Sequence, residues 1–273
     1  MLTQAEKGRA FRALHQRKQA FIIPNPWDVG TARLLARLGF EALATTSASY
    51  AFSLGRQDNS IDRDETMAHV AAIASATDLP VSADLENGFG DAPETVAETI
   101  RLAAETGLVG GSIEDVSGRA NSALYELEQA TDRVRAAIEV SRNLPFPFTL
   151  TARAENYLVG RPHLKDTIRR LQAYQEAGAD VLYAPGLSSK ADIASVVSSV
   201  DRPLNVIMGL QGVQLSLAEL SAIGVRRVSV GSALSRAALG AFLRAAKEMR
   251  EHGTFAFATD AVSYRDINSM FKG

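Results

Sequence analysis

Two acidic residues, Asp84 and Glu86, stand two positions apart in the segment Pro80-Val-Ser-Ala-Asp-Leu-Glu-Asn-Gly-Phe-Gly90. The segment is typical of a buried strand that ends in a glycine-containing turn. Because alternate side chains of a strand share a face, we expect both carboxylates to project together from the end of the strand. Adjacent carboxylates repel each other unless a cation or a shared proton relieves the repulsion. The pair therefore indicates a divalent metal held by oxygen ligands, with an exposed acidic turn as the alternative.

Other polar residues follow the predicted strands at their carboxyl ends. They are Asn25, Trp27, Asp28, Thr45, Thr46, Ser47, Asp58, Glu114, Asp115, Arg153, Glu155, Asn156 and Asn205. In α/β proteins this end of the sheet carries the active site. Several carboxylates around one Arg suit Mg²⁺ or Mn²⁺, which prefer oxygen ligands and retain several waters. Arg153 would then hold a substrate carboxylate or phosphonate in bidentate fashion.

Each of these residues also has a structural interpretation. Asp28 could cap the helix that follows it, and Glu114 and Asp115 could cap the next segment. Arg153 could pair with a neighbouring acid. Trp27 could be a core aromatic residue that closes the first strand.

A repeat of strand then helix would position these residues. The predicted strands are 21–27, 42–47, 80–86, 110–115, 148–155, 181–185, 204–208 and 227–231, and helical periodicity lies between them at 29–38, 66–76, 93–105, 164–176 and 217–223. Eight such units predict an α/β protein with one (β/α)₈ TIM-type barrel. A doubly wound open sheet is the alternative, although no Gly-x-Gly-x-x-Gly follows the first strand.

We interpret residues 1–273 as a single barrel domain, because no linker-like or low-complexity segment divides them. Residues 1–20 form an N-terminal helix in this interpretation. Residues 254–273 form a polar C-terminal extension with a helical pattern from Asp260. We expect this extension to pack on the barrel or on a neighbouring subunit.

The composition excludes several classes of function. A net charge of −2 gives no reason to expect a nucleic acid or a membrane as partner. The absence of Cys excludes disulfides, zinc–thiolate sites and thiol nucleophiles. No apolar signal core or membrane span is evident, so a cytoplasmic protein is expected. The Lys residues avoid the strand ends, which argues against a Schiff-base aldolase, and the four His residues fall on predicted helices, where we expect them at the surface.

Five segments together resemble the isocitrate lyase/phosphoenolpyruvate mutase superfamily. They are Ile23-Pro-Asn-Pro-Trp-Asp28, Ser53-Leu-Gly55 with Asp58, Ser82-Ala-Asp-Leu-Glu-Asn-Gly-Phe-Gly90, Gly111-Ser-Ile-Glu-Asp115 and Thr151-Ala-Arg-Ala-Glu155. The resemblance runs in order over residues 21–249, so it is more specific than any single motif. It implies a (β/α)₈ barrel whose terminal helix is exchanged between subunits in a homodimer or homotetramer.

The resemblance also implies roles for individual residues. Mg²⁺ (or Mn²⁺) would bind at Asp84, with Asp58, Glu86 and Glu114 acting mainly through metal-bound waters. The substrate would meet the loop at Ser47 and Ala48, and we expect Trp27 and Asn205 to contact it as well. We assign catalytic roles to Arg153, Glu114, Arg119 and Asn121.

The chain departs from the superfamily pattern at three places. Glu86 stands where members commonly carry a second Asp. Members that cleave isocitrate or methylisocitrate have a mobile Lys-Cys-Gly-His loop after the fourth strand, where this chain has Val116-Ser-Gly-Arg-Ala-Asn-Ser122 and lacks that general acid. Phosphonate-handling members have Lys-x-Asn-Ser there, which Arg119-Ala-Asn121-Ser122 resembles, but they also carry a His where this chain has Pro185. Arg119 stays protonated, so it could act as an electrostatic clamp rather than as an acid.

The reaction that needs the fewest of these missing groups is Mg²⁺-dependent cleavage of a carbon–carbon bond. A lyase or decarboxylase would act on a small 2-oxo or 2-hydroxy di- or tricarboxylic acid through a metal-stabilised enolate. Water, Tyr50, Tyr157 or Tyr183 would donate the proton. Phosphonopyruvate chemistry, as a phosphoenolpyruvate mutase or a phosphonopyruvate hydrolase, is the alternative. A barrel that binds a carboxylate without turnover is the third hypothesis.

Overall fold

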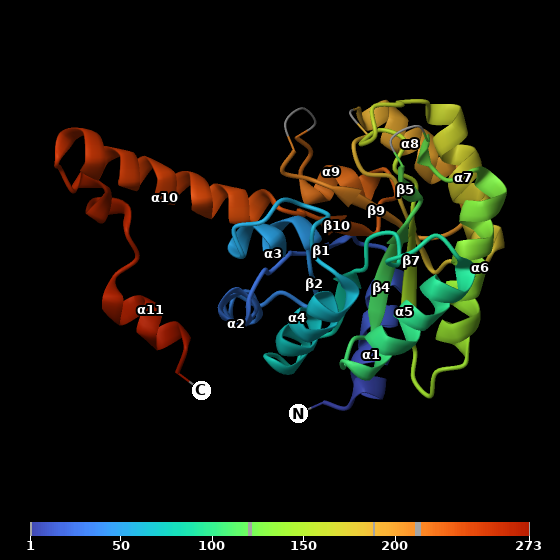
Figure 1. Cartoon of the computed structure of the whole chain (residues 1–273), viewed down its shortest axis with the longest axis horizontal. Coiled ribbons are helices and arrows are strands. Elements are labelled where there is room, and N and C mark those ends of the chain that lie inside the picture. The colour runs from blue at the N-terminus through green and yellow to red at the C-terminus, as the bar shows by residue number, and fades with distance from the viewer. Residues whose placement is uncertain (1, 120–121, 188, 211–213, 273) are drawn as a thin grey trace.

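The computed structural model describes residues 2–119, 122–187, 189–210 and 214–272. Its parallel strands are β1 (Phe21–Ile23), β2 (Leu43–Ala44), β3 (Val81–Asp84), β4 (Gly110–Glu114), β7 (Thr149–Arg153), β8 (Val181–Tyr183), β9 (Leu204–Ile207) and β10 (Arg227–Ser229). They follow one another in the order β1-β10-β9-β8-β7-β4-β3-β2. This nearly closed sheet, surrounded by helices, confirms the predicted (β/α)₈ barrel (Figure 1). Each predicted strand contains an observed one, and the observed strands are shorter because their last predicted residues turn into the loops.

Asn25 closes the gap between β1 and β2, which the strand ladder leaves open. Its Nδ2 donates to the carbonyl of Thr45 at 3.0 Å, and the backbone N–H of Ala44 donates to the carbonyl of Pro24 at 3.1 Å. Its Oδ1 accepts the N–H groups of Val230 and Gly231, both at 2.9 Å. One buried amide therefore joins the ends of three strands, which explains why a polar residue stands there.

The outer layer consists of the helices that separate these strands. They are α2 (Val29–Arg37), α4 (Arg63–Ser75), α5 (Pro93–Glu105), α6 (Leu127–Arg142), α7 (Leu164–Glu176), α8 (Lys190–Ser199) and α9 (Leu217–Ala222). Asp28 caps α2, with its Oδ1 accepting the N–H of Thr31 at 2.6 Å, so the capping interpretation of Asp28 is confirmed. A short helix after β2, α3 (Ser47–Ser53), was not predicted from the sequence.

The apolar core lies between the sheet and this outer layer. Outward-facing strand residues such as Val81, Leu150, Leu182 and Val206 pack there with the inner faces of the helices. The opposite faces of the same strands carry polar residues, in contrast to the aliphatic layers that usually fill such barrels. The outer face of each strand thus stabilises the fold, whereas the inner face of the same strand lines the barrel interior.

Helix α1 (Gln4–Gln16) covers the amino-terminal end of the barrel with a second apolar cluster. Phe11, Leu14 and Phe21 belong to that cluster. His15 packs among them, with its ring centroid 4.7 Å from that of Phe11 and 5.1 Å from that of Phe21, in edge-to-face geometry. The prediction of a surface position is therefore wrong for His15, which is 6% exposed. Burial lowers the pKa of His15 to about 3, with the nearby charge of Arg227 adding to the effect.

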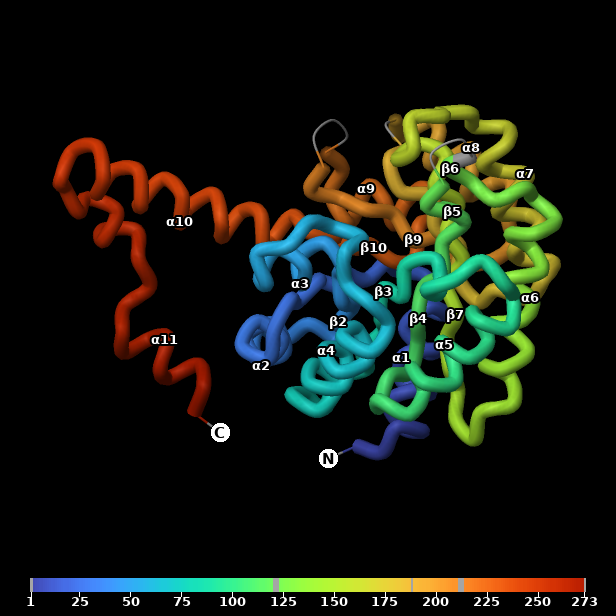
Figure 2. The backbone as a smooth tube through the Cα atoms, in the orientation of Figure 1, coloured from blue at the N-terminus to red at the C-terminus, as the bar shows by residue number. Residues whose placement is uncertain are grey.

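The last part of the chain leaves the barrel as an arm. Helix α10 (Ala233–His252) extends away from the body, and the chain returns through η1 (Ala256–Asp260) and α11 (Tyr264–Met270) (Figures 1 and 2). Near the end of the arm, Nη1 of Arg37 in α2 donates to the carbonyl of Lys272 at 3.2 Å. None of the described helices combines the length and the apolar character that crossing a membrane requires.

The buried imidazole of His15 makes stability sensitive to acid. Its pKa is about 3 in the folded protein, against about 6.5 in an unfolded chain. Between these values the unfolded chain binds one more proton, so stability falls as pH decreases from 6.5, by up to about 1.4 kcal/mol per pH unit. Urea unfolding between pH 7 and 4 should show this slope reduced in His15→Gln relative to the parent. His252→Gln, at an exposed position, should keep the parental slope, and parallel curves for the parent and His15→Gln would contradict the assignment.

Candidate active site

A cavity of about 150 Å³ lies inside the barrel and reaches its mouth. Of the residues to which we assign a catalytic, substrate-binding or metal-binding role, those that line it are Ser47, Ala48, Asp58, Asp84, Arg153 and Asn205. These residues come from strands β3, β7 and β9 and from the segments that follow β2. The barrel therefore brings together residues that are up to 158 positions apart in the chain, from Ser47 to Asn205.

The strand register explains why the interior is polar. Arg227 pairs with Asn205, Asn205 with Tyr183, Tyr183 with Arg153, and Arg153 with Glu114. Register partners on neighbouring strands face the same side of a sheet. These five side chains therefore form one inward row, which starts at the first residue of β10 and ends at the last residue of β4. Because barrel strands are tilted, such a row climbs from the interior to the mouth.

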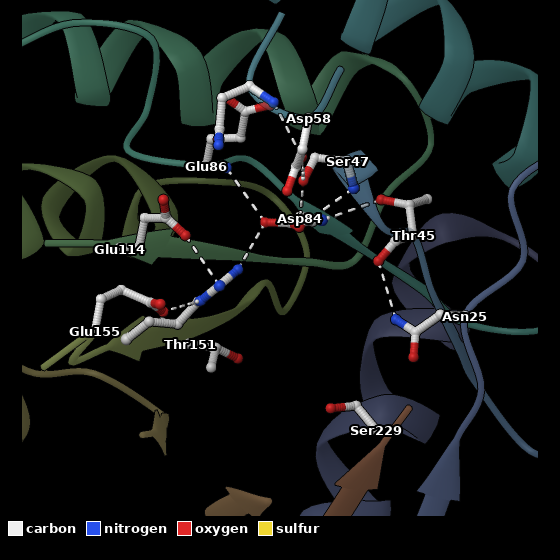
Figure 3. A network of polar contacts seen from close by, with 12 residues as sticks. Asn25, Thr45, Ser47, Asp58, Asp84, Glu86, Glu114, Thr151, Glu155 and Ser229 are labelled. Atoms are coloured by element: carbon white, nitrogen blue, oxygen red, sulfur yellow. Dashed lines mark hydrogen bonds and ion pairs between the residues drawn. The ribbon is translucent and has the colours of Figure 1, made fainter. Parts of the chain in front are cut away.

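Arg153 is the centre of the acidic network at the mouth. Its Nη1 lies 2.8 Å from Asp84 Oδ1, its Nη2 3.0 Å from Glu114 Oε2, and its Nε 2.8 Å from Glu155 Oε1. The side chain is 12% exposed, so these are strong, charge-assisted contacts (Figure 3). The structural interpretation of Arg153, pairing with Glu155 or Glu114, is thus observed, and Asp84 joins the same network.

Ser47 joins Asp84 to Asp58. The backbone N–H and Oγ of Ser47 contact Asp84 Oδ2 at 3.3 and 3.0 Å, and the same Oγ lies 3.4 Å from Asp58 Oδ1. The N–H of Asp84 donates to Thr45 Oγ1 at 3.0 Å. Ser47 and Ala48, predicted as a loop, are the first residues of α3, so their backbone N–H groups have no partner within that helix.

Glu86 does not share a strand face with Asp84, which corrects our geometric prediction. β3 ends at Asp84, and Glu86 follows in a turn with φ of 48°, a left-handed conformation that costs energy for a residue with a side chain. Asp84 consequently faces the inner cavity. Glu86 and Glu114 line a second hollow of about 890 Å³ outside it. The four predicted metal residues thus lie along the boundary between the two spaces.

Burial makes these acids costly to ionise. It raises the pKa of Glu86 to about 7, and repulsion from Asp84 adds to this effect. Burial also raises the pKa of Glu114 well above its usual range, against the opposing attraction of Arg153. Glu86 Oε1 is buried and has no hydrogen-bond partner among the described residues. A nearby cation would relieve all three of these unfavourable conditions.

The available ligand atoms fit a hard divalent ion that is coordinated by only a few protein groups. The residues concerned, Asp58, Asp84, Glu86 and Glu114, all offer oxygen. In the described part of the chain, no three acidic or His side chains already form a compact metal cluster. Mg²⁺ does not need one, because it commonly takes one or two carboxylates and keeps several waters.

Trp27 and Arg119, predicted to act in substrate binding and catalysis, do not line the inner cavity. Trp27 is half-buried, and its backbone N–H donates to Thr31 Oγ1 at 3.2 Å. Arg119 is exposed and pairs with Asp91. Asn121 lies outside the described residues. Their roles in substrate binding and catalysis stay predictions.

The segment after β4, which we expected to be a loop, contains a short antiparallel hairpin of β5 (Val116–Arg119) and β6 (Ser122–Leu124). The backbone N–H of Tyr125 donates to the carbonyl of Asp115 at 2.9 Å. Asp115 in turn accepts Tyr174 Oη at 2.6 Å and Arg170 Nη1 at 3.1 Å. Asp115 therefore anchors the hairpin to the barrel and does not act as a helix cap.

Sequence reasoning missed Arg227 as a cavity residue and Thr151 as its hydrogen-bond partner. Arg227 lines the cavity, and its Nη2 donates to Thr151 Oγ1 at 3.0 Å. The only sequence signal was alternation, because Arg227 and Ser229 share the inner face of one strand. Of the three candidate tyrosine donors, Tyr183 alone lines this cavity among the described residues. Tyr50 stacks instead on His69, with ring centroids 3.7 Å apart.

The comparisons with known proteins agree with this geometry. The family model described as phosphoenolpyruvate phosphomutase matches residues 11–250. The fold resembles the crystal structure of a Burkholderia cenocepacia protein proposed to be a lyase or mutase, with 66% identity, a TM-score of 0.97, and coverage of 99% of this chain and 97% of that one. The 2-methylisocitrate lyase of Escherichia coli is 30% identical over 72% of this chain and 68% of its own. The oxaloacetate decarboxylase of Pseudomonas paraeruginosa is 28% identical over 88% of this chain and 84% of its own.

These relatives include characterised lyases, and the resemblance predicted from the sequence is confirmed. A barrel with acids at its mouth, matched by one family model over most of its length, leads to one conclusion. The chain belongs to the phosphoenolpyruvate phosphomutase family of the isocitrate lyase/phosphoenolpyruvate mutase superfamily.

Proposed function

We propose that this protein is a Mg²⁺-dependent lyase or decarboxylase that cleaves a carbon–carbon bond in a small 2-oxo or 2-hydroxy di- or tricarboxylic acid. The observation that carries the proposal is the row of acids beside the inner cavity, which includes the unpartnered Oε1 of Glu86. The two lyase relatives act on acids of this class, as their names state. The small, polar cavity of about 150 Å³ favours a substrate of a few carbon atoms.

Asp84 would hold the ion directly, and Asp58, Glu86 and Glu114 would act mainly through waters. Mg²⁺ bound there would supply Lewis-acid stabilisation of negative charge on the 2-oxo oxygen of the substrate. Ser47 orients Asp84 through its backbone N–H and its hydroxyl. Arg153 holds Asp84 and Glu114 in place, and it neutralises part of their charge.

For oxaloacetate the reaction needs no base to start it. The bond between C3 and C4 breaks, CO₂ leaves, and the bonding pair moves into the enolate. Ala48, at the first turn of α3, presents a backbone N–H that can bind the substrate's oxygen atoms. A proton must then be delivered to C3.

Tyr183 is the proton donor that the geometry favours. It lines the cavity, and its ring lies 5.2 Å from the Arg153 guanidinium. Burial raises the pKa of its hydroxyl well above the usual value, so the group stays protonated at neutral pH. A protonated phenol facing the cavity can give its proton to an enolate carbon and regain one from water.

Removing the Asp84 carboxylate should abolish turnover. We expect Asp84→Ala to lower kcat/KM by about a thousandfold or more, because the variant loses the carboxylate that would hold the ion directly. Turnover of oxaloacetate, substituted malates, methylisocitrate and phosphonopyruvate would be followed by ¹H and ³¹P NMR with Mg²⁺ and with EDTA. Mg²⁺ binding would be measured in parallel by calorimetry.

The exposed Asp201→Ala variant serves as the control and should behave as the parent. Carbon–carbon cleavage that survives in Asp84→Ala, or that ignores EDTA, would contradict the metal site. A new phosphorus signal from phosphonopyruvate would instead place the protein with the phosphonate enzymes.

The role of Tyr183 has its own test. Tyr183→Phe should lower kcat by about a hundredfold or more, the usual contribution of a positioned acid, with little change in KM. Tyr50→Phe is the matched control. It removes the hydroxyl of a ring that stacks on His69 away from the cavity. An equal and small effect of the two changes would show that water donates the proton.

We also propose that α10 packs on a second copy of the chain, as a homodimer or part of a homotetramer. Only Ser235 of this 20-residue helix is buried. Its exposed apolar residues are Leu234, Leu239, Phe242, Leu243 and Met249, with Phe242 66% exposed. An apolar face of this length on an extended arm favours burial against another subunit.

Charge on that face should separate the subunits. We expect Phe242→Glu to shift the mass measured by light scattering after gel filtration toward that of one chain, about 29.2 kDa for the parent sequence. Arg250→Glu, an exposed position on the same helix, should leave the mass of the assembly unchanged. A parent that already elutes as a single chain would refute the assembly.

A further inference from the structure

Arg227 is a buried cation that no described carboxylate neutralises. It is the first residue of β10 and is 5% exposed. Its Nε donates to Asn205 Oδ1 at 2.9 Å and its Nη2 to Thr151 Oγ1 at 3.0 Å. Its Nη1 is buried with no hydrogen-bond partner in the part of the chain that the structure describes. Among the described residues no carboxylate pairs with this guanidinium.

Such an arrangement is unfavourable for stability. Burying a charge is costly unless a counter-charge and a full set of hydrogen bonds offset it. Burial lowers the pKa of Arg227 to about 10, and the like charge of Arg153 adds to the effect. We therefore expect a neutral residue in this place to leave the free protein as stable or more stable, in which case a structural role does not account for Arg227.

The guanidinium faces the inner cavity. Below it lies the apolar cluster under α1, where the neutral imidazole of His15 offers no negative charge. Tyr183 and Arg153 are the titratable groups nearest to Arg227 in the inward row. Ser229, two positions further along β10, lies apart from Asp84 and Glu86 across the network in Figure 3. Arg227 thus stands at the end of the cavity away from the acids.

The charge of the other arginine of the cavity is already compensated by acids of its own chain. Arg153 already contacts Asp84, Glu114 and Glu155 through Nη1, Nη2 and Nε. A substrate carboxylate bound there would lie close to three acids that repel it. Arg227 has no such acids around it among the described residues, and its Nη1 has no hydrogen-bond partner there.

We propose that Arg227 binds the substrate carboxylate that points away from the acidic mouth, and that it thereby selects dicarboxylic over monocarboxylic acids. Asn205 and Thr151 orient the guanidinium, which makes Asn205 a positioning residue as well as a wall of the cavity. The proposal rests on the proposed function in one respect, the placement of the reacting end of the substrate at the acids. Its test requires no turnover.

Two 2-hydroxy acids that differ by one carboxylate, malate and lactate, isolate this contact. Their dissociation constants would be measured by calorimetry with Mg²⁺, for the full-length protein and for Arg227→Gln. The parent should bind malate at least about tenfold more tightly than lactate, since a charge-assisted contact in a buried site supplies that difference. Arg227→Gln should lose this preference through weaker malate binding, with lactate affinity unchanged within about twofold. Arg227→Lys, which keeps the charge without the planar fork, should retain part of it.

The unfolding temperature provides the second readout. Without ligand, Arg227→Gln should be as stable as the parent or more stable, and malate should no longer raise its unfolding temperature. Arg133→Gln is the matched control, because Arg133 is equally buried but donates to the backbone carbonyls of Gly90, Asp91 and Asn87. That change should lower stability and leave the malate-to-lactate ratio intact.

Several outcomes would overturn the inference. They are a parent without preference for malate (including one that binds neither acid), a preference that survives in Arg227→Gln, and a loss of stability in Arg227→Gln with the ratio unchanged. Failure of the proposed function looks different. In that case the turnover screen stays silent, whereas the preference for malate still depends on Arg227.

Discussion

The compensation of buried negative charge at the barrel mouth is the constraint on which the rest of this structure depends. Asp84, Glu114 and Glu155 sit on or just after three neighbouring strands, and the Arg153 guanidinium contacts all three at 2.8 to 3.0 Å. Each acid alone would be expensive to bury, and one cation cannot neutralise them all. The raised pKa of Glu86 and its unpartnered oxygen show where compensation is incomplete. Incomplete compensation in the free protein would favour binding of a cation, as the proposed function requires.

Much of the fold could be predicted because it is encoded locally. Strands buried under helices are short apolar runs between turn residues, and each helix has its own periodicity and cap, as at Asp28. Asp84 was found because it ends such a run. Glu86 shows the limit of the same reasoning, because the strand stops two residues before it and a left-handed turn redirects the side chain. Strand periodicity predicts which face of the sheet a side chain occupies only as far as the strand continues.

What could not be predicted depends on contacts between distant segments. His15 has the surroundings of a surface helix in the sequence, and only the docking of α1 on Phe21 makes it a core residue. The hairpin after β4 is held through Asp115 by Tyr174 and Arg170, which lie more than 50 positions further along the chain. In the sequence Arg227 resembles any other strand residue, and only the pairing of β10 with β9 places it beside Asn205.

The two arginines of the inward row divide the work of binding charge. The charge of Arg153 is compensated by acids from its own chain, so Arg153 stabilises the mouth and holds the residues that would take the metal. Arg227 is held by neutral groups and keeps one donor unpaired, so its charge is available to a ligand. If the surroundings of the two arginines were exchanged, neither would keep its role. An Arg deep in the cavity whose charge is already compensated by acids would not attract an anionic ligand. The apolar layer outside the sheet and the cluster under α1 offset the cost of this polar interior. The barrel can therefore keep an unfavourable charge where recognition needs it, since its stability is generated on the other face of the same strands.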